Sequence, residues 1–366
     1  MIRVLYITRA KLSLSRAHTR NIIKTAEYLS QEEGVHVTLF SSAAESRTGE
    51  ELRNMNGVIY PFELLLAPFG RSLFAALFRF QKSFDVLYFR DPVLWHIALI
   101  ARFLFGKKIV FEAHGSHEWR FMKPLWLLSF YVSHGVVYIT EKLRIWYDPR
   151  NKKKSAVVHA NAPDFELFLE KDKTRLSLRQ HLRISPDAFL LVYAGSGMWY
   201  DVKFLIHLLP LLPPSCTLLL VGLKDAEKEA LRAVAASIWV EERVFLILRV
   251  SRREFPQYLL MADVLLIPPT LTFPGSICSK LYEYLAAGVP IVAHKAGAND
   301  EVLRHGKNAF VIENPTPDDY VGYISQVMHN KELAASLGRE AIADARQYTW
   351  EARAERIGSL LKRIMV

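Results

Sequence analysis

Short apolar runs alternate with longer amphipathic segments along the whole chain. In the first half the apolar runs cover residues 2–7, 36–40, 85–89, 108–114, 135–139 and 156–159. In the second half they cover residues 189–195, 216–222, 244–248, 263–268, 290–294 and 309–312. Continuous apolar runs of this length are typical of parallel strands that are covered on both faces. Helix-length segments such as residues 17–31 and 95–105 separate them, so the pattern predicts βαβ units in an α/β protein.

The apolar runs fall into two sets along the chain, one in each half. This predicts two Rossmann-like domains, each with a doubly wound parallel sheet, that face a cleft. The polar, mixed segment 161–186 is expected to be the crossover between them. We therefore place an N-terminal domain at residues 1–160 and a second domain at residues 161–348. Residues 349–366 predict a terminal amphipathic helix that packs back on the N-terminal domain.

The composition is that of a globular protein with an unevenly placed charge. Of 366 residues, 51% are apolar and 23% are charged, and the net charge is +10. Residues 1–160 hold 23 Lys and Arg against 13 Asp and Glu, whereas residues 161–366 hold 24 of each. A basic half suits an anionic membrane, a phosphorylated substrate or nucleic acid. Because no nucleic-acid motif accompanies it, we expect no nucleic-acid partner; a solvated basic surface is the alternative.

Several features predict a cytoplasmic location. The apolar run within residues 1–13 is too short, and its charge comes too early, for a signal peptide. No stretch reaches the ~18 uncharged apolar residues that a membrane-spanning helix needs. The cysteines Cys216 and Cys278 are isolated, which is typical of a reducing compartment.

In doubly wound sheets, ligands lie beyond the carboxyl ends of the strands. One such loop, residues 193–199 (YAGSGMW), contains Gly195, Ser196 and Gly197 and precedes a helix-like segment at 204–212. Glycines allow the backbone to approach a ligand closely, and bare N–H groups at such a loop hold phosphate. A plain tight turn would need the same glycines.

Residues 275–294 predict a loop, a short helix and a strand. Lys280 falls in the first turn of the helix, where the helix dipole disfavours a cation, so a bound anion would offset the cost. Glu283 lies three residues on, on the same face. Ser276 or Ser279 is expected to cap the helix. The alternative is an exposed Lys280–Glu283 ion pair.

Two further predicted strands end in side chains that could bind a ligand or act in catalysis. His114 and Glu112 end one strand, and we expect both to point into the cleft between the domains. His114 could donate a hydrogen bond to a substrate hydroxyl or transfer a proton, although a lone histidine is more often structural. Arg90 and Asp91 close another strand, and the alternative to a ligand contact is that they pair with each other.

Three stretches in fixed order carry the strongest family pattern: residues 256–268 (PQYLLMADVLLIP), 279–294 (SKLYEYLAAGVPIVAH) and 297–312 (GANDEVLRHGKNAFVI). Weaker matches are YFRDP, FEAHG, NAPDFELF and YAGSGMW. Over most of its length the chain resembles the family-4 glycosyltransferases, which are retaining enzymes of the GT-B fold. The resemblance implies a nucleotide-sugar site in the second domain.

The resemblance also implies roles for individual residues. Glu283 would accept hydrogen bonds from the ribose hydroxyls and, with His114, is expected to be a catalytic residue. Lys280 and the amides around Ser276–Ser279 would face the diphosphate or the donor sugar. The loop of Gly195, Ser196 and Gly197 would bracket the diphosphate from the opposite side. His114 would touch the donor sugar near the reacting carbon, and the acceptor would lie on the basic first domain.

The chain departs from the family pattern at two loops. The family commonly has two glutamates separated by seven residues, and Gly275 occupies the first position, where we expect only a donor contact. The loop at 195–201 reads GSGMWYD where an arginine and a lysine are usual. The loop after the first strand lacks the family's Gly-Gly pair, which leaves Ser15, Arg16 and Arg90 as candidates for acceptor contacts.

Together these features predict a retaining, metal-independent glycosyltransferase without a cofactor that uses a UDP- or GDP-sugar. No Asp-x-Asp or metal-spaced His/Cys cluster occurs in the sequence. A glycan or lipid-linked acceptor in cell-envelope or surface polysaccharide synthesis is expected. Residues 62–84 mix Phe and Leu with Arg71, Arg79 and Lys82, as an interfacial helix on an anionic membrane would; a buried helix is the alternative.

Two other classes of function remain open on the sequence. A non-catalytic GT-B relative that binds a nucleotide or a protein partner would explain Gly275 and the GSGMWYD loop, since a fold does not guarantee activity. An epimerase or a phosphorylase could use the same architecture, but no lysine can be assigned to a pyridoxal or phosphate site.

Overall fold

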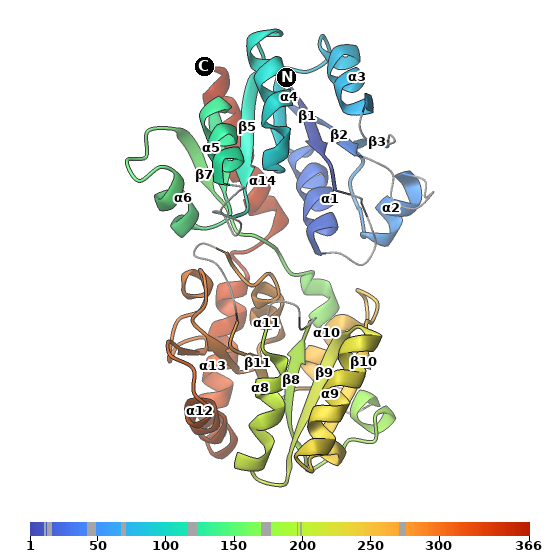
Figure 1. Ribbon diagram of the computed structural model, residues 1–366, viewed down its shortest axis with the longest axis vertical. Helices are drawn as coiled ribbons and strands as arrows, with labels where there is room; N and C mark the ends of the chain where they lie inside the picture. The colour runs from blue at the N-terminus through green and yellow to red at the C-terminus, as the bar shows by residue number, and fades with distance from the viewer. Residues whose placement is uncertain are drawn as a thin grey trace. The chain divides into compact units, whose positions relative to one another are not determined.

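The computed structural model describes residues 1–10, 12, 17–41, 49–66, 71–115, 123–169, 177–195, 197, 200–270 and 276–366. Its contacts divide the chain into two compact units (Figure 1). Unit 1 consists of Met1–Asn161, Phe273–Ser276 and Thr349–Val366, and unit 2 consists of Ala162–Thr272 and Ile277–Tyr348.

Unit 1 is built on a parallel sheet of seven strands in the order β3-β2-β1-β4-β5-β6-β7. The strands are β1 (Ile2–Thr8), β2 (Val35–Ser41), β3 (Glu63–Leu66), β4 (Val86–Phe89), β5 (Lys108–Ala113), β6 (Gly135–Tyr138) and β7 (Lys154–Val157). All four residues of β4 and of β6 are buried, which explains why these strands read as continuous apolar runs.

The helices of unit 1 flank this sheet (Figure 1). They are α1 (Ala17–Leu29), α2 (Gly49–Met55), α3 (Arg71–Phe80), α4 (Trp95–Phe103), α5 (Lys123–Val132), α6 (Glu141–Tyr147) and α14 (Trp350–Met365). Helix α14 begins where the Thr349 hydroxyl accepts a hydrogen bond from the Ala352 N–H at 3.1 Å. It packs on α1, β6 and β7, so the end of the chain belongs to the core of unit 1.

Unit 2 is built on a parallel sheet of six strands in the order β10-β9-β8-β11-β12-β13. The strands are β8 (Phe189–Ala194), β9 (Cys216–Leu223), β10 (Val244–Leu248), β11 (Val264–Ile267), β12 (Ile291–His294) and β13 (Phe310–Ile312). The helices are α8 (Val202–His207), α9 (Asp225–Ser237), α10 (Phe255–Leu260), α11 (Leu281–Ala287), α12 (Pro317–His329) and α13 (Lys331–Ala345). Each sheet is a parallel Rossmann-like sheet, as the alternating pattern predicts.

Helix α11 is held in a fixed place by a close approach to α13. It ends at Gly288, whose φ of +60° is left-handed and favours glycine. A side chain at Gly288 would collide with Ile342 of α13, and one at Gly338 would collide with the Gly288 backbone. All seven residues of α11 are buried. The short helix that precedes Gly288 is therefore locked against the core of unit 2.

Two segments differ from their predicted structure. The predicted interfacial helix at 62–84 is wrong in its first part, because Glu63–Leu66 forms β3, which pairs with β2. Among the described residues of this segment, only those of α3 are helical. The predicted helix at 204–212 is divided into α8 and a 3-10 turn at Leu209–Leu211. Pro210 lies in that turn and has no N–H with which to continue a helix.

Candidate functional site

Lys280 lies at the start of α11 and is enclosed by two tyrosines. Its Nζ donates a hydrogen bond to Tyr193 Oη at 2.9 Å. The same atom lies 4.1 Å from the ring centroids of both Tyr193 and Tyr200. Burial lowers the pKa of Lys280 to about 8. The lysine is thus a half-buried cation held by π faces and one hydroxyl.

The alternative to a bound anion, an exposed ion pair between Lys280 and Glu283, is not observed. No ion pair of Lys280 occurs within the described part of the chain. Glu283 instead binds Arg252, whose Nη1 donates to its Oε1. The predicted cap is also wrong: α11 begins after Lys280 itself, which occupies the N-cap position without a side-chain cap bond, rather than after Ser276 or Ser279.

Gly195 brings the end of β8 over Lys280. Its φ of +134° is one that side chains rarely adopt, and a Cβ there would lie 2.5 Å from Lys280 Nζ. The backbone at this position therefore favours glycine, and a side chain there would displace the Lys280 ammonium. Gly195 and Lys280, two of the predicted donor-site residues, are brought together although 85 residues separate them in the sequence.

The expectation of bare amides in this loop is not met at two positions. The Gly195 N–H donates to the Val221 carbonyl at 2.7 Å. The Gly197 N–H donates to Glu227 Oε1 at 3.1 Å, and Glu227 also caps α9 by accepting from the Lys224 N–H. Positive charge at this strand end therefore comes from Lys280 rather than from these two N–H groups. Ser196 and Gly275 lie outside the described residues.

Arg252 is a site residue that the sequence reasoning missed. It follows β10 and bridges two carboxylates: its Nη1 binds Glu283, and its Nε lies 3.3 Å from Asp164 Oδ2. Its Nη2 is buried and has no hydrogen-bond partner among the described residues. The rule that ligands lie beyond the carboxyl ends of parallel strands applies to Arg252 as it does to the predicted residues, and it could have identified this arginine.

In unit 1 a cavity of about 400 Å³ lies at the carboxyl ends of β1, β4 and β5. It is lined by Thr8, Arg9, Ala10, Arg90, Asp91, Pro92 and His114. Arg90 and His114 are thus together, as their strand-end positions suggest. Ser15 and Arg16, the other residues predicted to contact an acceptor, lie outside the described residues.

Arg90 and Asp91 do not pair with each other. Arg90 Nη2 lies 3.2 Å from His114 Nδ1. Asp91 accepts from the Val93 N–H at 3.0 Å and so caps the 3-10 turn Pro92–Leu94. Of the two residues, only Arg90 directs its side chain to a predicted catalytic group.

His114 is held by partners at both ring nitrogens. Its Nε2 contacts Glu112 Oε1, and its Nδ1 faces Arg90. Burial and the Arg90 charge lower the pKa of His114 to about 4, so the ring is neutral at physiological pH. A carboxylate accepts and a guanidinium donates, so Nε2 carries the proton and Nδ1 accepts. Glu112 itself is fully buried, contrary to the expectation that it points into a cleft.

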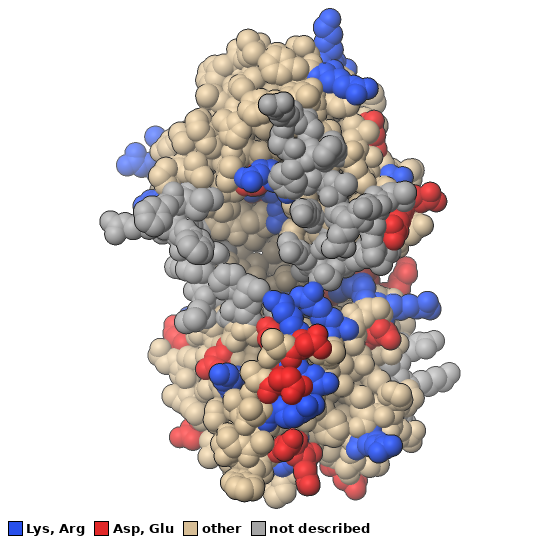
Figure 2. Space-filling model, turned by 45° about the vertical axis from the view of Figure 1, so that its right-hand side comes forward, with Lys and Arg blue, Asp and Glu red and all other residues tan. Residues whose placement is uncertain are grey.

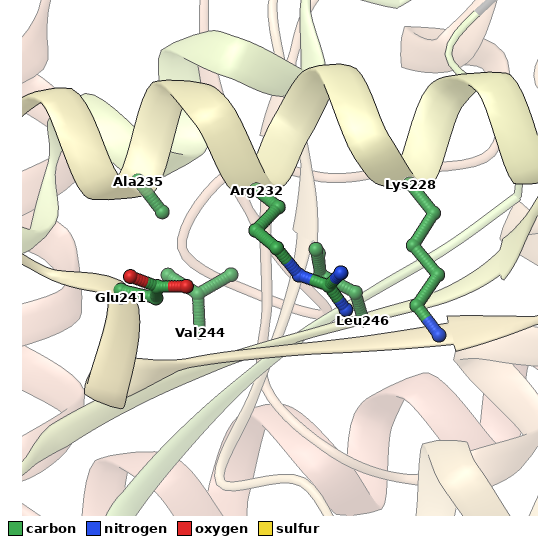
Figure 3. A pocket seen from close by; sticks show the side chains of 6 residues that line it. All are labelled: Lys228, Arg232, Ala235, Glu241, Val244 and Leu246. Atoms are coloured by element: carbon green, nitrogen blue, oxygen red, sulfur yellow. The ribbon is translucent and has the colours of Figure 1, made fainter.

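A second, smaller cavity of about 100 Å³ lies between α9 and the edge strand β10 (Figure 3). Lys228 and Arg232 extend from α9 toward the strand (Figure 3). Arg232 Nη1 binds Glu229 of its own helix at 3.2 Å. None of the predicted site residues lines this cavity. Within the described ranges, no group of three or more His, Cys, Asp or Glu side chains is arranged to hold a metal ion.

Two family models match consecutive parts of the chain. The model described as Glycosyltransferase Family 4 matches residues 19–164, and the model described as Glycosyl transferases group 1 matches residues 174–344. Both models describe glycosyltransferases, and together they match most of the chain. The second match contains Lys280, Glu283 and Arg252, so the residues gathered at the strand ends of unit 2 all lie within the region that matches the group 1 model.

Curated glycosyltransferases are similar to this chain over part of its length. A D-inositol 3-phosphate glycosyltransferase of Streptomyces scabiei is 24% identical over 213 residues, which is 55% of this chain and 47% of the relative. A GDP-mannose-dependent alpha-(1-6)-phosphatidylinositol monomannoside mannosyltransferase of Mycobacterium tuberculosis is 26% identical over 141 residues, which is 37% of this chain and 36% of the relative. The chain therefore spans about a third to a half of the length of these relatives.

A solved structure confirms the fold. The crystal structure of the Anabaena protein HepE in complex with UDP matches with a TM-score of 0.82 and 17% sequence identity. The match covers 99% of this chain and 100% of that chain. The predicted GT-B fold, with two Rossmann-like parallel-sheet units, is thus confirmed.

Proposed function

We propose that the chain transfers a sugar from a nucleoside diphosphate sugar to a glycan or lipid-linked acceptor, with retention of configuration and without a metal ion or cofactor. The observation that carries this proposal is Lys280, a cation without a carboxylate partner among the described residues. It lies against the strand-end glycine Gly195 in the region that matches the group 1 glycosyltransferase model. The anionic partner that it lacks within the chain would be the diphosphate.

Lys280 suits the negative charge that develops on the leaving diphosphate during transfer. The bond between the anomeric carbon and the diphosphate oxygen breaks, a bond to the acceptor oxygen forms, and the acceptor proton leaves with the nucleoside diphosphate. Negative charge grows on the diphosphate in this step, and a preorganised cation stabilises it. With Lys280 in that role, the charge on the diphosphate is met without a metal ion. The resemblance implies UDP or GDP as the nucleotide, and the UDP complex of HepE supports UDP.

Glu283 is assigned to the ribose rather than to covalent chemistry. Arg252 binds its Oε1 and fixes the orientation of the carboxylate. A carboxylate in an ion pair is a fixed acceptor for hydroxyl groups but a poor nucleophile. We assign the cavity of about 400 Å³ in unit 1 to the acceptor and call it the acceptor cavity. His114 is assigned to its wall together with Arg90, because both ring nitrogens of His114 already have partners and neither is free for proton transfer.

The acceptor is proposed to be bound at a membrane surface on the cytoplasmic side. Large apolar side chains are exposed on three neighbouring helices of unit 1, with α4 in contact with both α3 and α5; they are Phe74, Phe78, Leu99, Phe103, Leu104, Leu128 and Tyr131. Figure 2 shows a broad uncharged area on unit 1 with Lys and Arg side chains at its borders. We name the seven exposed apolar residues given above the α3–α5 surface and expect this surface to bind anionic lipid. No helix in the described part of the chain is long and apolar enough to cross a bilayer.

The activity is tested by release of nucleoside diphosphate from a panel of UDP-, GDP- and ADP-sugars, with water as the acceptor. One nucleotide class should be hydrolysed in the presence of EDTA, and proton NMR should show that the released sugar keeps its anomeric configuration. Lys280→Met should lower kcat/KM by about a hundredfold, since removal of one preorganised donor costs ~2.7–4 kcal/mol of transition-state stabilisation.

The rival is a non-catalytic relative that binds the nucleotide without turnover. The engaged N–H groups of Gly195 and Gly197 favour it, because they leave fewer donors for a leaving group. Binding of a nucleoside diphosphate without any release from the sugar panel would support the rival. Inversion at the anomeric carbon, or a strict requirement for Mg²⁺ or Mn²⁺, would overturn the corresponding part of the proposal.

A further inference from the structure

A buried carboxylate, Glu112, contacts His114 in the wall of the acceptor cavity of unit 1. Glu112 is fully buried at the end of β5 and receives three donors. Tyr88 Oη donates to its Oε2, and His114 Nε2 and Arg353 Nη2 both contact its Oε1, the latter at 2.6 Å. Burial alone would raise the pKa of Glu112, but the Arg353 and His114 partners hold it well below its ordinary value. Glu112 is therefore an anion.

The cation that balances Glu112 comes from the other end of the chain. Arg353 lies on α14, 241 residues after Glu112, and is fully buried. Its Nε donates to Thr25 Oγ1 at 3.1 Å, and its Nη1 donates to the His159 carbonyl at 2.5 Å. All three of its nitrogens are engaged, so the guanidinium has one orientation. None of these three partners, Thr25, His159 and Glu112, lines the cavity, and Arg353 is connected to the cavity wall through Glu112 and His114.

A chain of contacts leads from Arg353 to the cavity wall. The Glu112 anion fixes the proton of His114 on Nε2, which leaves the Nδ1 lone pair to accept from Arg90 at 3.2 Å. Arg90 also reaches Asn21 Oδ1 of α1 at 3.5 Å. If His114 were protonated on both nitrogens, Nδ1 would repel Arg90 instead of binding it. The position of the Arg90 side chain at the cavity wall thus depends on a neutral His114 ring.

We propose that Arg353 is a positioning residue for the acceptor cavity: by pairing with Glu112 it keeps His114 neutral and so holds Arg90 at the cavity wall. The helix that ends the chain would then set the charge and shape of a site formed by strands near its beginning. The consequence for acceptor binding rests on the proposed transferase function, whereas the state of His114 does not.

The groups that face His114 and Glu112 come from four elements. Glu112 lies on the same strand, Tyr88 and Arg90 come from β4 and its end, Tyr6 from β1, and Arg353 from α14. Burial raises the pKa of Tyr6 and of Tyr88, so both stay neutral. Asp91 and Arg9 line the same cavity, 3.9 Å from each other. The charge on His114 is thus decided by its burial, by one anion, Glu112, and by two cations, Arg90 and Arg353.

The test is a pH titration of His114 by NMR of its ring nitrogens in the full chain. In the wild type the ring should stay neutral down to about pH 4. In Arg353→Met the Glu112 anion has lost its main partner and takes His114 as a cation, so the midpoint should rise toward the ordinary value of 6.5. Arg356→Met is the matched control, because Arg356 lies on the same helix, is exposed, and binds only the Val157 carbonyl in the described structure.

Two further variants keep the test decisive if Arg353→Met does not fold. Arg353→Gln removes the charge but keeps a polar group near Thr25. Arg353→Met with Glu112→Gln removes both buried charges, and the His114 midpoint should then stay low, because no anion remains to favour the imidazolium. An unchanged midpoint in a folded Arg353→Met or Arg353→Gln overturns the proposal, as does a rise that persists in the double variant.

Acceptor kinetics separate this proposal from the proposed function. If transfer is observed, Arg353→Met should raise the acceptor KM by about tenfold, the effect of one charge-assisted hydrogen bond, and leave the affinity for the nucleoside diphosphate unchanged. If no transfer is observed but the His114 midpoint moves, the transferase function fails and the positioning role stands. A moved KM with an unmoved midpoint would refute the positioning role alone.

Discussion

At the scale of single residues, Lys280 and Glu283 lie within one turn of α11 and have opposite charges, yet each is bound by other groups. Tyr193 and Tyr200 enclose the lysine, and Arg252 binds the glutamate. Separate partners keep the two charges from neutralising each other. The ammonium is left for an anionic ligand, and the carboxylate keeps a fixed orientation. This division suits a ligand that carries a diphosphate at one end and hydroxyl groups at the other.

The pKa of Lys280 predicts how nucleotide binding depends on pH. Burial lowers this pKa to about 8, below the unfolded value of about 10.4, so the unliganded unit 2 loses the positive charge as pH rises through 8. A bound diphosphate favours the charged form, so binding takes up a proton near pH 8. The affinity for UDP or GDP should fall about tenfold between pH 7 and pH 9.

Isothermal titration calorimetry at pH 7, 8 and 9 measures this dependence, and buffers of different ionisation enthalpy report the proton uptake. Lys280→Met should bind weakly and without this pH dependence. An affinity that is the same at pH 7 and pH 9 in the wild type would show that the lysine ammonium does not meet the ligand.

The sequence predicted which residues carry charge at the strand ends, but not their partners. Lys280, Glu283 and His114 stand in loops that follow apolar runs, which is a local signal. Arg252 lies 31 residues before Glu283, and Arg353 lies 241 residues after Glu112. No periodicity or spacing joins such pairs, because the fold alone brings them together. For the same reason the bonded N–H groups of Gly195 and Gly197 could not be foreseen.

At the scale of elements, the strands were predictable because they are buried on both faces. The strands β4, β6 and β11 are buried at every position, so each is a continuous apolar run. The edge strand β3 was missed because none of its four residues is buried and its sequence, ELLL, continues into an amphipathic segment. Helix α3 then shows why that segment looked interfacial: Ala76 and Leu77 are buried, while Phe74 and Phe78 are 40% and 48% exposed.

The helices of the α3–α5 surface give a prediction of their own. Phe103 and Leu104, at the end of α4, are 71% and 64% exposed, and Arg102 lies 5.2 Å from the Phe103 ring. Burial of an apolar side chain in lipid contributes ~1.5–3 kcal/mol. Phe103→Ser with Leu104→Ser should therefore lower the partition into vesicles that contain phosphatidylglycerol by at least about tenfold.

Co-sedimentation with these vesicles measures the partition, and pure phosphatidylcholine vesicles separate the charge contribution. The matched control is Trp239→Asn in unit 2, because Trp239 is 94% exposed and its φ of +59° suits asparagine. Equal binding to both vesicle types, or equal loss in the control, would contradict a specific role for the α3–α5 surface.

At the scale of the whole molecule, the alternation of apolar runs and helices determined the fold class, because βαβ connectivity allows few other arrangements. The chain crosses from unit 1 to unit 2 near Asn161 and returns at Thr349. The return of α14 to unit 1 places Arg353 against Glu112, which contacts His114 in the wall of the proposed acceptor cavity. The alternating pattern of apolar runs and helices could not predict the contact between Arg353 and Glu112, since this contact joins segments that are distant in the sequence.

The measurement that tests the central claim most directly is calorimetric binding of UDP, GDP, ADP and CDP to the wild-type chain, Lys280→Met and Lys295→Met. Lys295 is the matched control, because it is an exposed lysine of unit 2 that pairs with Glu313 at 2.9 Å. One nucleotide should bind to the wild type and to Lys295→Met, and Lys280→Met should bind it at least about tenfold more weakly, as expected for the loss of a charged hydrogen-bond donor. Equal binding in all three proteins, or no binding of any of these nucleotides, would contradict a donor site at Lys280.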